Sequence, residues 1–491
     1  MSRIPEEPLS SAPQRELAEP VYHREDDSAN GRPNSQLSGA RDRQEDCTEF
    51  VKKPYAEAVD NSAVDSMDED DLEEASLKKQ RSKFRVWLEK IIPPGGVIAS
   101  SFTLGSSTLG AGILGLPAAF NSMGLVTALL VLIVVTVLTI YSMWLLARCA
   151  DVTRVRTYED VARLLLGRGA DYAAAIFMLG FCLGGAVSYI ISIGDLLTPI
   201  FDDPSVPEFL RKKNGNRLIT SMVWLVCILP LCLPKNIDTL RHSSIIGVIM
   251  VVFFVICIVQ DSSAFMSKNG WRKDIKFFNT GNGAIEGLGT VMFACLVQIN
   301  AQEVYYEMAK PTPRNMLRNS TIAMSGCGLL YVLAGVFGCA RFGTTVKSSI
   351  LLKYQPREAP QFWVAYCGIV LKICVAFALH QLPMRDGIYH FFSWDVYRMP
   401  WWRNAVICGG IAAAVLVIGL VVPDINTVLG LVGSLCGGFI GFIFPALMIM
   451  YAGNWNLKKV GWIEWSLTYI LLFVGIIAVV FGTSASIYGV I

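Results

Sequence analysis

Long apolar segments follow one another through this chain of 491 residues, from about position 97 to the end. Each is close to the ~20 residues that an α-helix needs to cross the hydrocarbon core of a bilayer. We therefore predict an all-α polytopic membrane protein. Eleven spans are expected, over residues 97–120, 123–149, 171–200, 217–234, 240–263, 282–307, 316–342, 360–384, 403–422, 425–452 and 463–490.

The N-terminal part of the chain has a different pattern. Residues 1–92 are polar, with few aromatic side chains, so they cannot bury enough apolar surface to fold. We predict a disordered tail over residues 1–92 and a transmembrane transporter domain over residues 93–491. A basic run at residues 78–85, just before the first span, favours the cytoplasmic side of a membrane.

The charges in the connections favour the same orientation. With the N-terminus inside, the inner loops and flanks contain 21 lysines and arginines, whereas the outer loops contain 12. The tail is therefore expected in the cytosol. The membrane is expected to be the plasma membrane, with a lysosome-like or vacuolar organelle as the alternative.

Small and polar residues interrupt the first span between Ser106 and Gly112, ahead of Pro117. Every backbone N–H and C=O group in hydrocarbon needs a partner, so a helix opens only where it lines a cavity or holds a ligand. Broken helices hold small zwitterions and their coupling ions in secondary transporters. Close helix packing on the small residues is the alternative interpretation. The literal GxGxxG at residues 110–115 does not indicate a dinucleotide site, because no strand precedes it.

Span 6 carries a polar stretch at the matching place, from Gln298 to Glu303, although it has no Gly or Pro there. Spans 1 and 6 are the first helices of two five-helix halves. Paired interruptions at these positions indicate an inverted repeat. We therefore predict that helices 1 and 6 are both broken.

Five segments match a known family in their order and spacing: Thr108–Pro117, Phe293–Glu307, Phe342–Leu351, Val422–Gly433 and Pro445–Leu447. The chain resembles the amino acid/auxin permease family, a branch of the amino acid/polyamine/organocation superfamily, and within it the protozoan amino-acid permeases. The resemblance implies a leucine-transporter-like repeat of five plus five helices with an extra eleventh helix. It also implies secondary active transport of amino acids by alternating access.

An opened span 1 offers groups to both ends of an α-amino acid. The freed N–H groups of residues 110–112 can bind a carboxylate, helped by the dipole of the half-helix that follows. The carbonyls of residues 107–109 can accept hydrogen bonds from the ammonium group, and glycines at 110 and 112 permit a close approach. The residues predicted to bind the substrate are Ser107, Thr108, Leu109, Gly110, Ala111, Gly112, Phe293, Gln298 and Asn300.

Two residues bear on ion coupling. Lys372 lies near the middle of span 8, where an unpaired charge is costly, so it should face the bundle interior. The resemblance implies a sodium ion between helices 1 and 8 in related transporters, and we predict that the Lys372 ammonium replaces it and carries a proton. A purely structural pairing of Lys372 is the alternative. Ser106 stands where the sodium-coupled branch has Asn, which favours proton coupling or uniport.

Two acidic residues flank the predicted inner end of span 6. Glu307 is expected to close an inner gate or to pair with Lys310 or Arg314. Glu303 would favour arginine or lysine as substrate if it turns towards the site. Neutral and cationic substrates therefore both stay open. Gln298 stands where the family commonly has His, and an amide cannot titrate.

Other classes of function find little support in the sequence. It contains neither HExxH nor GxSxG with partner residues, so we expect no enzyme. The 13 cysteines are scattered, which predicts no disulfide framework, no metal site and no cofactor. A formal charge of +2 gives no reason to expect nucleic acid. A channel and a transceptor with little net flux are the alternatives to a transporter.

Overall fold

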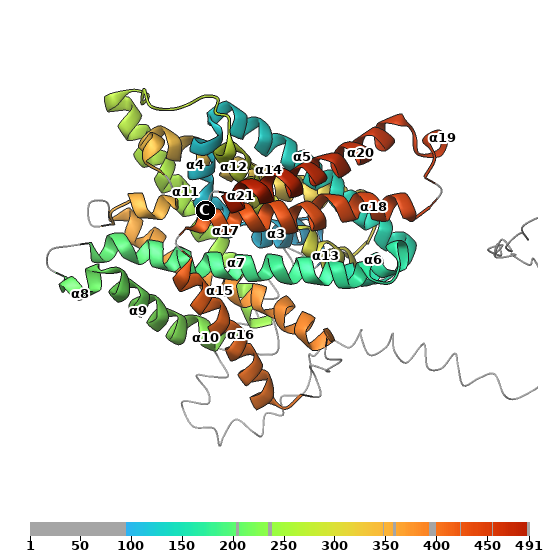
Figure 1. The fold of residues 1–491 in the computed structure, drawn as a ribbon, viewed down its shortest axis with the longest axis horizontal. Coiled ribbons are helices and arrows are strands. Elements are labelled where there is room, and N and C mark those ends of the chain that lie inside the picture. The colour runs from blue at the N-terminus through green and yellow to red at the C-terminus, as the bar shows by residue number, and fades with distance from the viewer. Residues whose placement is uncertain are drawn as a thin grey trace, which may run out of the picture. The chain divides into compact units, whose positions relative to one another are not determined.

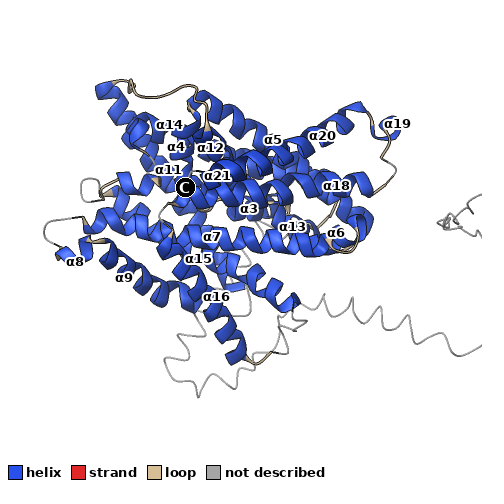
Figure 2. Ribbon diagram, viewed as in Figure 1, coloured by secondary structure: helices blue, strands red, loops and turns tan. Residues whose placement is uncertain are grey.

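The computed structural model describes residues 95–488, except 203–205, 234–237, 347, 357–359, 392–398, 423 and 454. The predicted tail, residues 1–92, lies outside the described residues. Every regular element in the described part is a helix, as the uniform blue of Figure 2 shows. The prediction of an all-α protein is confirmed.

By length and apolar composition, ten helices of the described chain could each cross a membrane, and a bent pair makes eleven. The bent pair is α3 (Val97–Thr108) and α4 (Gly112–Met123), which meet at 62° and form span 1. The predicted number of spans is confirmed, with boundaries that differ by a few residues. In chain order, spans 2 to 11 are Leu125–Thr153, Ala170–Phe201, Lys213–Cys232, Ile245–Asn269, Asn282–Glu307, Pro313–Thr345, Gln361–Tyr389, Trp401–Val421, Ile425–Tyr451 and Trp462–Tyr488.

Figure 1 labels the helices that make up these spans. Single helices account for six of them: α5 (Leu125–Thr153), α7 (Ala170–Phe201), α11 (Asp238–Asn269), α14 (Pro313–Phe342), α15 (Gln361–Phe391) and α16 (Trp401–Val421). Composite spans contain α9 (Lys213–Val223), η2 (Trp224–Ile228) and α10 (Leu229–Cys232); α12 (Asn282–Cys295), η3 (Gln298–Asn300) and α13 (Ala301–Glu307); α17 (Ile425–Val432), η6 (Gly433–Ile443) and α18 (Phe444–Tyr451); and α20 (Trp462–Ile477), η7 (Ala478–Gly482) and α21 (Thr483–Tyr488). Short helices in the connections are α6 (Tyr158–Leu166), α8 (Glu208–Arg211) and α19 (Leu457–Val460).

The spans carry apolar side chains on their outward faces, the reverse of a soluble bundle. In α5, Leu130 and Val137 are more than half exposed, whereas Thr139 and Ser142 are buried. Lipid can surround the first pair, and the bundle interior supplies hydrogen-bond partners for the second. The exposed apolar faces are therefore the lipid-facing surface.

Spans 1 and 6 lie against each other inside the bundle. The helix α4 packs on α12, and α3 packs on α14. In Figure 1 the blue helices α3 and α4 lie among the other helices rather than at the edge. The approach to span 6 is close, because a Cβ atom on Gly112 would lie 2.6 Å from the Cβ of Ala294. The first helices of the two predicted halves therefore meet directly.

Three spans contain π-helical segments that the sequence did not predict. The longest, η6, occupies the middle of span 10. Its carbonyls bind side chains from other elements: Tyr158 of α6 donates to the carbonyl of Ile440 at 2.8 Å, and Ser142 of α5 donates to that of Gly441. The π segment thereby fixes span 10 to span 2 and to the connection after it.

Candidate functional site

Span 1 opens over three residues. The helix α3 ends at Thr108, Leu109 is extended with ψ of 93°, and α4 begins at Gly112. The predicted break is confirmed, but it starts three residues later than expected. Ser107 and Thr108 still belong to α3, and both hydroxyls donate to the carbonyl of Leu104, at 2.9 and 2.7 Å. Such back-bonding is common for these side chains in a helix. The proton of each hydroxyl is therefore already used in a hydrogen bond within α3.

Span 6 opens as well. The helix α12 ends at Cys295, and Leu296 is extended with ψ of 112°. The 3-10 turn η3 follows, and α13 then continues the span. The prediction of paired breaks is confirmed. Phe293, in the last turn of α12, is buried beside the opening.

Tyr331 of α14 joins the two breaks. Its hydroxyl lies 2.9 Å from the carbonyl oxygen of Thr108 and 2.8 Å from that of Ala294, and its one proton can go to either. Both carbonyls belong to the last turn of a half-helix, where no helical N–H follows to bind them. Tyr331 is fully buried. The two breaks therefore face each other across a single side chain, which no local sequence pattern indicated.

Lys372 of α15 reaches the end of α3. Its Nζ donates to the carbonyl of Ser106 at 3.0 Å, and the residue is 4% exposed. The C-terminal end of a helix attracts a cation. Gly247 of α11 leaves room for the lysine stem, because a Cβ there would lie 2.7 Å from Lys372 Cδ. The prediction that Lys372 faces the interior is confirmed, and the structure places it between helices 1 and 8.

Four ring side chains stand against the break of span 1. Phe181 and Tyr189 come from α7, Phe293 from α12 and His380 from α15. The ring centroids of Phe181 and Phe293 are 4.9 Å apart, and those of Tyr189 and His380 are 5.3 Å apart. A Cβ on Gly110 would lie 2.5 Å from the Tyr189 hydroxyl oxygen. These rings form an aromatic wall, of which Phe293 was among the residues predicted to bind the substrate.

His380 gives the aromatic wall one polar edge. Its Nδ1 lies 3.0 Å from the carbonyl oxygen of Ala376, one turn earlier in α15. A neutral imidazole that donates there keeps Nε2 as a hydrogen-bond acceptor, a tautomer assigned from this contact. Nε2 faces α7, since a Cβ on Gly185 would lie 2.9 Å from it.

Gln298 uses both ends of its amide within the protein. Its Oε1 accepts from the N–H of Val297 at 3.0 Å, and its Nε2 donates to the carbonyl of Gly441 at 3.4 Å. The residue is fully buried, whereas Asn300, at the end of the same turn, is half-buried. In this conformation Gln298 holds the break of span 6 against the π segment of span 10.

Glu303 and Glu307 lie one turn apart on α13, and both are exposed. Neither is among the buried residues around the breaks. Two carboxylates of α7 are more enclosed: Asp171, in the first turn, is 8% exposed and accepts from the N–H of Gly169, and one carboxyl oxygen of Asp195 is buried.

The glycines of span 1 have different neighbours. Gly112 faces the backbone of span 6, with Ala294 Cα 2.7 Å from the position of a Cβ. Gly115 faces Asn426 of span 10, whose Oδ1 would lie 2.5 Å away. The packing interpretation therefore applies to these two positions. Gly110 is half-buried and opens towards the aromatic wall.

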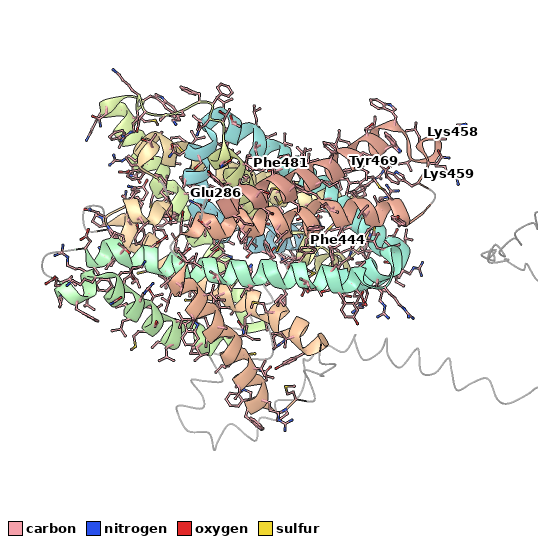
Figure 3. The ribbon with its side chains drawn as sticks, in the orientation of Figure 1. Glu286, Phe444, Lys458, Lys459, Tyr469 and Phe481 are labelled. Atoms are coloured by element: carbon pink, nitrogen blue, oxygen red, sulfur yellow. The ribbon has the colours of Figure 1, made fainter. Side chains whose placement is uncertain are left out.

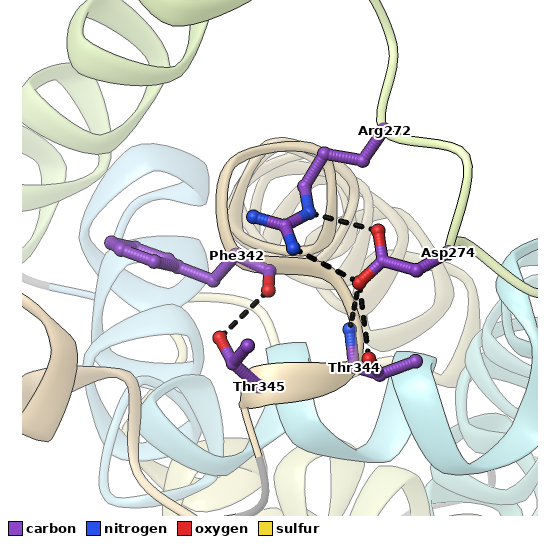
Figure 4. Close-up of polar contacts among 5 residues, drawn as sticks. All are labelled: Arg272, Asp274, Phe342, Thr344 and Thr345. Carbon is purple, nitrogen blue, oxygen red and sulfur yellow. Dashed lines mark hydrogen bonds and ion pairs between the residues drawn. The ribbon is translucent and has the colours of Figure 1, made fainter.

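A polar cluster on the predicted outer side links the connection before span 6 to the end of span 7 (Figure 4). Asp274 accepts from Arg272 at 2.8 and 3.1 Å, and from the backbone N–H and hydroxyl of Thr344 at 3.2 and 3.0 Å. The hydrogen bonds from Arg272, aided by Thr344, hold the pKa of Asp274 well below its usual range. Farther along, the N–H of Asn279 donates to the carbonyl of Met123 at 3.1 Å. The connection is therefore hydrogen-bonded to the end of span 7 through Asp274 and to the end of span 1 through Asn279.

Several named proteins are similar to this chain. A sodium-coupled neutral amino acid transporter 7 of Xenopus laevis is 29% identical over 415 residues, covering 79% of this chain and 87% of the relative. Amino acid transporter AVT6E of Arabidopsis thaliana is 24% identical, covering 80% and 83%. Vacuolar amino acid transporter 5 of Schizosaccharomyces pombe is 26% identical, covering 73% and 85%.

A solved structure supports the fold. The manganese transporter of Eremococcus coleocola superposes with a TM-score of 0.51 at 13% identity, covering 81% of this chain and 87% of that one. The likeness supports the leucine-transporter-like arrangement and says nothing of the substrate. The family model for transmembrane amino acid transporter proteins matches residues 93–488. The chain therefore belongs to this family, the amino acid/auxin permeases, and is an integral membrane transporter rather than an enzyme.

Proposed function

We propose that the protein carries an α-amino acid across the membrane by alternating access, with the substrate bound between the breaks of spans 1 and 6. The observation that supports this most directly is the hydroxyl of Tyr331 between the freed carbonyls of Thr108 and Ala294. Two opened helices that face each other present backbone N–H and C=O groups in one place. These groups suit the carboxylate and ammonium that all amino acids share.

Neutral amino acids are the proposed substrates. The wall beside Gly110 consists of Phe181, Tyr189 and Phe293 with one neutral acceptor on His380. A cationic side chain would need a carboxylate partner once it is removed from water. Glu303, the candidate for that role, is exposed on α13. The wall instead favours apolar or aromatic side chains of the substrate.

Lys372 is proposed to couple transport to protons. Its ammonium already occupies the end of α3 at Ser106, the place where the resemblance puts sodium in related transporters. A protonated lysine holds this carbonyl, and a neutral lysine holds it far less strongly. Protonation would therefore favour the conformation in which α3 is fixed to span 8. Sodium-coupled transport at this position is disfavoured, because the cation site is filled by the protein itself.

The test is uptake of radiolabelled alanine, phenylalanine and lysine into proteoliposomes, with and without an inward proton gradient. We expect saturable uptake of the neutral substrates, stimulated by the gradient, and little uptake of lysine. In Lys372→Met the stimulation should vanish while the protein remains folded. Normal pH dependence in that variant would remove the proton role and leave Lys372 as a structural pair.

The same vesicles separate the alternatives to a carrier. A channel would give currents far above carrier turnover and no countertransport of labelled substrate. A transceptor would bind amino acid without net flux. Accelerated exchange when unlabelled substrate is present on the opposite side supports alternating access, and its absence contradicts it.

We also propose a plasma-membrane location and a cytoplasmic N-terminus, and the excess of lysine and arginine in the inner loops supports the second point. One relative is named a vacuolar transporter, so the organelle is the alternative to exclude. Accessibility of an N-terminal epitope in intact and permeabilised cells tests both points at once. Staining of an internal organelle, or of the epitope in intact cells, would contradict the proposal.

A further inference from the structure

Hydroxyls in the spans commonly donate to a carbonyl one turn earlier in the same helix. Ser188 donates to Gly184 in this way, at 2.8 Å, and Ser484 to Val480, at 2.7 Å. Ser434 of span 10 and Ser486 of span 11 differ. They are 0% and 1% exposed, and neither hydroxyl has a hydrogen-bond partner within the protein. A buried polar atom is almost always bound to something.

The two serines belong to one helix crossing. A Cβ on Gly482 would lie 2.3 Å from Ser434 Oγ, and a Cβ on Gly430 would lie 3.1 Å from Ser486 Oγ. Each serine therefore sits over the glycine that is four residues from the other serine. Small residues at this spacing let helix backbones approach closely. The crossing places both hydroxyls in the interior of the bundle.

Span 6 forms the third side of this crossing. A Cβ on Gly289 of α12 would lie 2.4 Å from Ser434 Oγ. Glu286, one turn earlier on the same face, has its Cγ 3.1 Å from the Cβ position of Gly430, beside Ser486. Figure 3 labels Glu286 next to the ribbon of the last helix, with which α12 is in contact. The side chain is half-buried, and Asp424, at the start of span 10, acts on it electrostatically.

We propose that Glu286, Ser434 and Ser486, here called the oxygen junction, bind a small monovalent cation, either sodium or hydronium. The junction combines a carboxylate with two hydroxyl oxygens that lack any other partner. A carboxylate inside a membrane span needs a compensating charge. Hydroxyl and carboxylate oxygens are hard ligands of the kind that alkali cations and hydronium accept. The carboxylate of Glu286 supplies the negative charge, and the cation is the partner that the two serine hydroxyls lack within the protein.

The position of the oxygen junction gives the cation a structural consequence. Glu286 and Gly289 lie on α12, the half-helix that runs directly into the break of span 6. Ser434 is the second residue of the π segment η6, and Ser486 follows the π segment η7 by one turn. Such segments are often found at functional sites. A bound cation therefore fixes α12 to spans 10 and 11, at a place separate from Lys372 and Ser106.

The experiment measures cation binding without transport, using the purified full-length protein in lipid nanodiscs. Choline chloride is replaced by sodium chloride at constant ionic strength and pH, and the melting temperature is recorded. We expect a saturable rise of about 3 °C, the order of effect that a ligand above its Kd gives. The rise should be lost in Glu286→Gln and in the double variant Ser434→Ala/Ser486→Ala.

Ser484→Ala is the matched control on the same helix. Its hydroxyl already donates to Val480, and it is exposed, so the sodium effect should persist. A second readout guards against variants that fold poorly: radioactive sodium bound to the unchanged protein should be displaced by cold sodium but not by choline. Loss of the sodium effect in Ser484→Ala would contradict the assignment.

A parallel series in sodium-free choline buffer separates hydronium from sodium. If the ligand is hydronium, the protein is stabilised as the pH falls, and Glu286→Gln removes that stabilisation, with Asp424 as the other charged group in range. The proposal fails if neither cation stabilises the protein, or if Glu286→Gln leaves the effect unchanged. Lys372→Met should keep the effect. Its loss there would move the cation to spans 1 and 8, whatever the outcome of the transport assays.

Discussion

The breaks of spans 1 and 6 both interrupt a membrane helix, but different features of the molecule produce them. In span 1 the chain itself is suited to opening, because Gly110 follows the extended Leu109 and small residues continue on either side. In span 6 the opening lies between Cys295 and Gln298, in a stretch with neither Gly nor Pro. Side chains hold that opening in place, above all the Gln298 amide and the Tyr331 hydroxyl.

The break of span 1 is thus intrinsic, because its own residues favour it, whereas the break of span 6 is imposed by contacts with other spans. The glycines of span 1 lower the cost of an irregular backbone wherever the helix is placed. The break of span 6 depends on partners in spans 7 and 10, so it exists only in the assembled bundle. Substitutions in span 1 should therefore act through steric overlap and altered backbone conformation. Substitutions around span 6 should act through the loss of hydrogen bonds.

The largest effect is expected from Gly112→Ala. The new Cβ would lie 2.7 Å from Ala294 Cα and 2.6 Å from its Cβ, and backbone cannot move aside as a flexible side chain can. Overpacking of a well-filled interior typically costs about 1–3 kcal/mol, and contact with backbone raises the cost. We expect little monodisperse protein in fluorescence-detected size-exclusion chromatography. Normal yield and melting temperature would show that spans 1 and 6 are not in direct contact.

Gly110→Ala is the matched control two residues earlier. Its Cβ would meet only the hydroxyl end of Tyr189, at 2.5 Å. This variant should fold but lose most of its uptake, and Tyr189→Phe in the same chain should restore part of it by removing the oxygen. Failure of the rescue would place the constraint at Gly110 in the backbone rather than in the aromatic wall.

Tyr331→Phe should give the next largest effect, because it acts on both breaks at once. The carbonyls of Thr108 and Ala294 lose their shared donor, and a buried group left unsatisfied costs about 1–3 kcal/mol. We expect uptake to fall by about 10- to 100-fold with the protein still folded. The measurement is initial uptake per folded molecule in proteoliposomes. Unchanged uptake would mean that the hydroxyl does not organise the site.

The sequence predicted the spans and the two breaks because their signals are local. Each span is an apolar run of sufficient length, and the break of span 1 is indicated by its Gly, Ser and Thr content. The polar stretch from Gln298 to Glu303, at the matching place in span 6, indicated the pairing of spans 1 and 6. Lys372 was placed correctly because a charge in an apolar run must turn inward.

The rest of the candidate site depends on contacts between spans. Tyr331 gives the same local signal whether its hydroxyl bridges two breaks or merely packs, and His380 and Phe181 gave no signal at all. The π segment η6 has a composition that also suits an ordinary close-packed helix. Ser107 and Thr108 were expected to lie in the opened stretch, but both belong to the last turn of α3, where their hydroxyls donate to the carbonyl of Leu104.

A smaller effect is expected from Gln298→Leu, which tests the imposed break alone. Gly441 keeps Ser142 as a second donor, so one amide contact and the Val297 N–H bond are lost. A net loss of about 1 kcal/mol corresponds to a rise in KM of about fivefold. Concentration series of uptake separate KM from maximal rate. A fall in maximal rate alone would assign Gln298 to the conformational change instead of to the resting geometry.

The smallest effect is expected for the ion pair of Arg272 and Asp274 in the connection before span 6, which belongs to neither break. Since the pKa of Asp274 is lowered in the folded protein, its stabilisation is complete above the unfolded value of about 3.9 and is lost as the pH falls below it. The pair with Arg272 is one-third exposed, so it contributes no more than about 1 kcal/mol. Asp274→Asn should therefore lower the melting temperature by about 2 °C or less at pH 7. The gap to the unchanged protein should begin to narrow as the pH falls below about 4, and a gap that widens instead would reverse the sign assigned to this carboxylate.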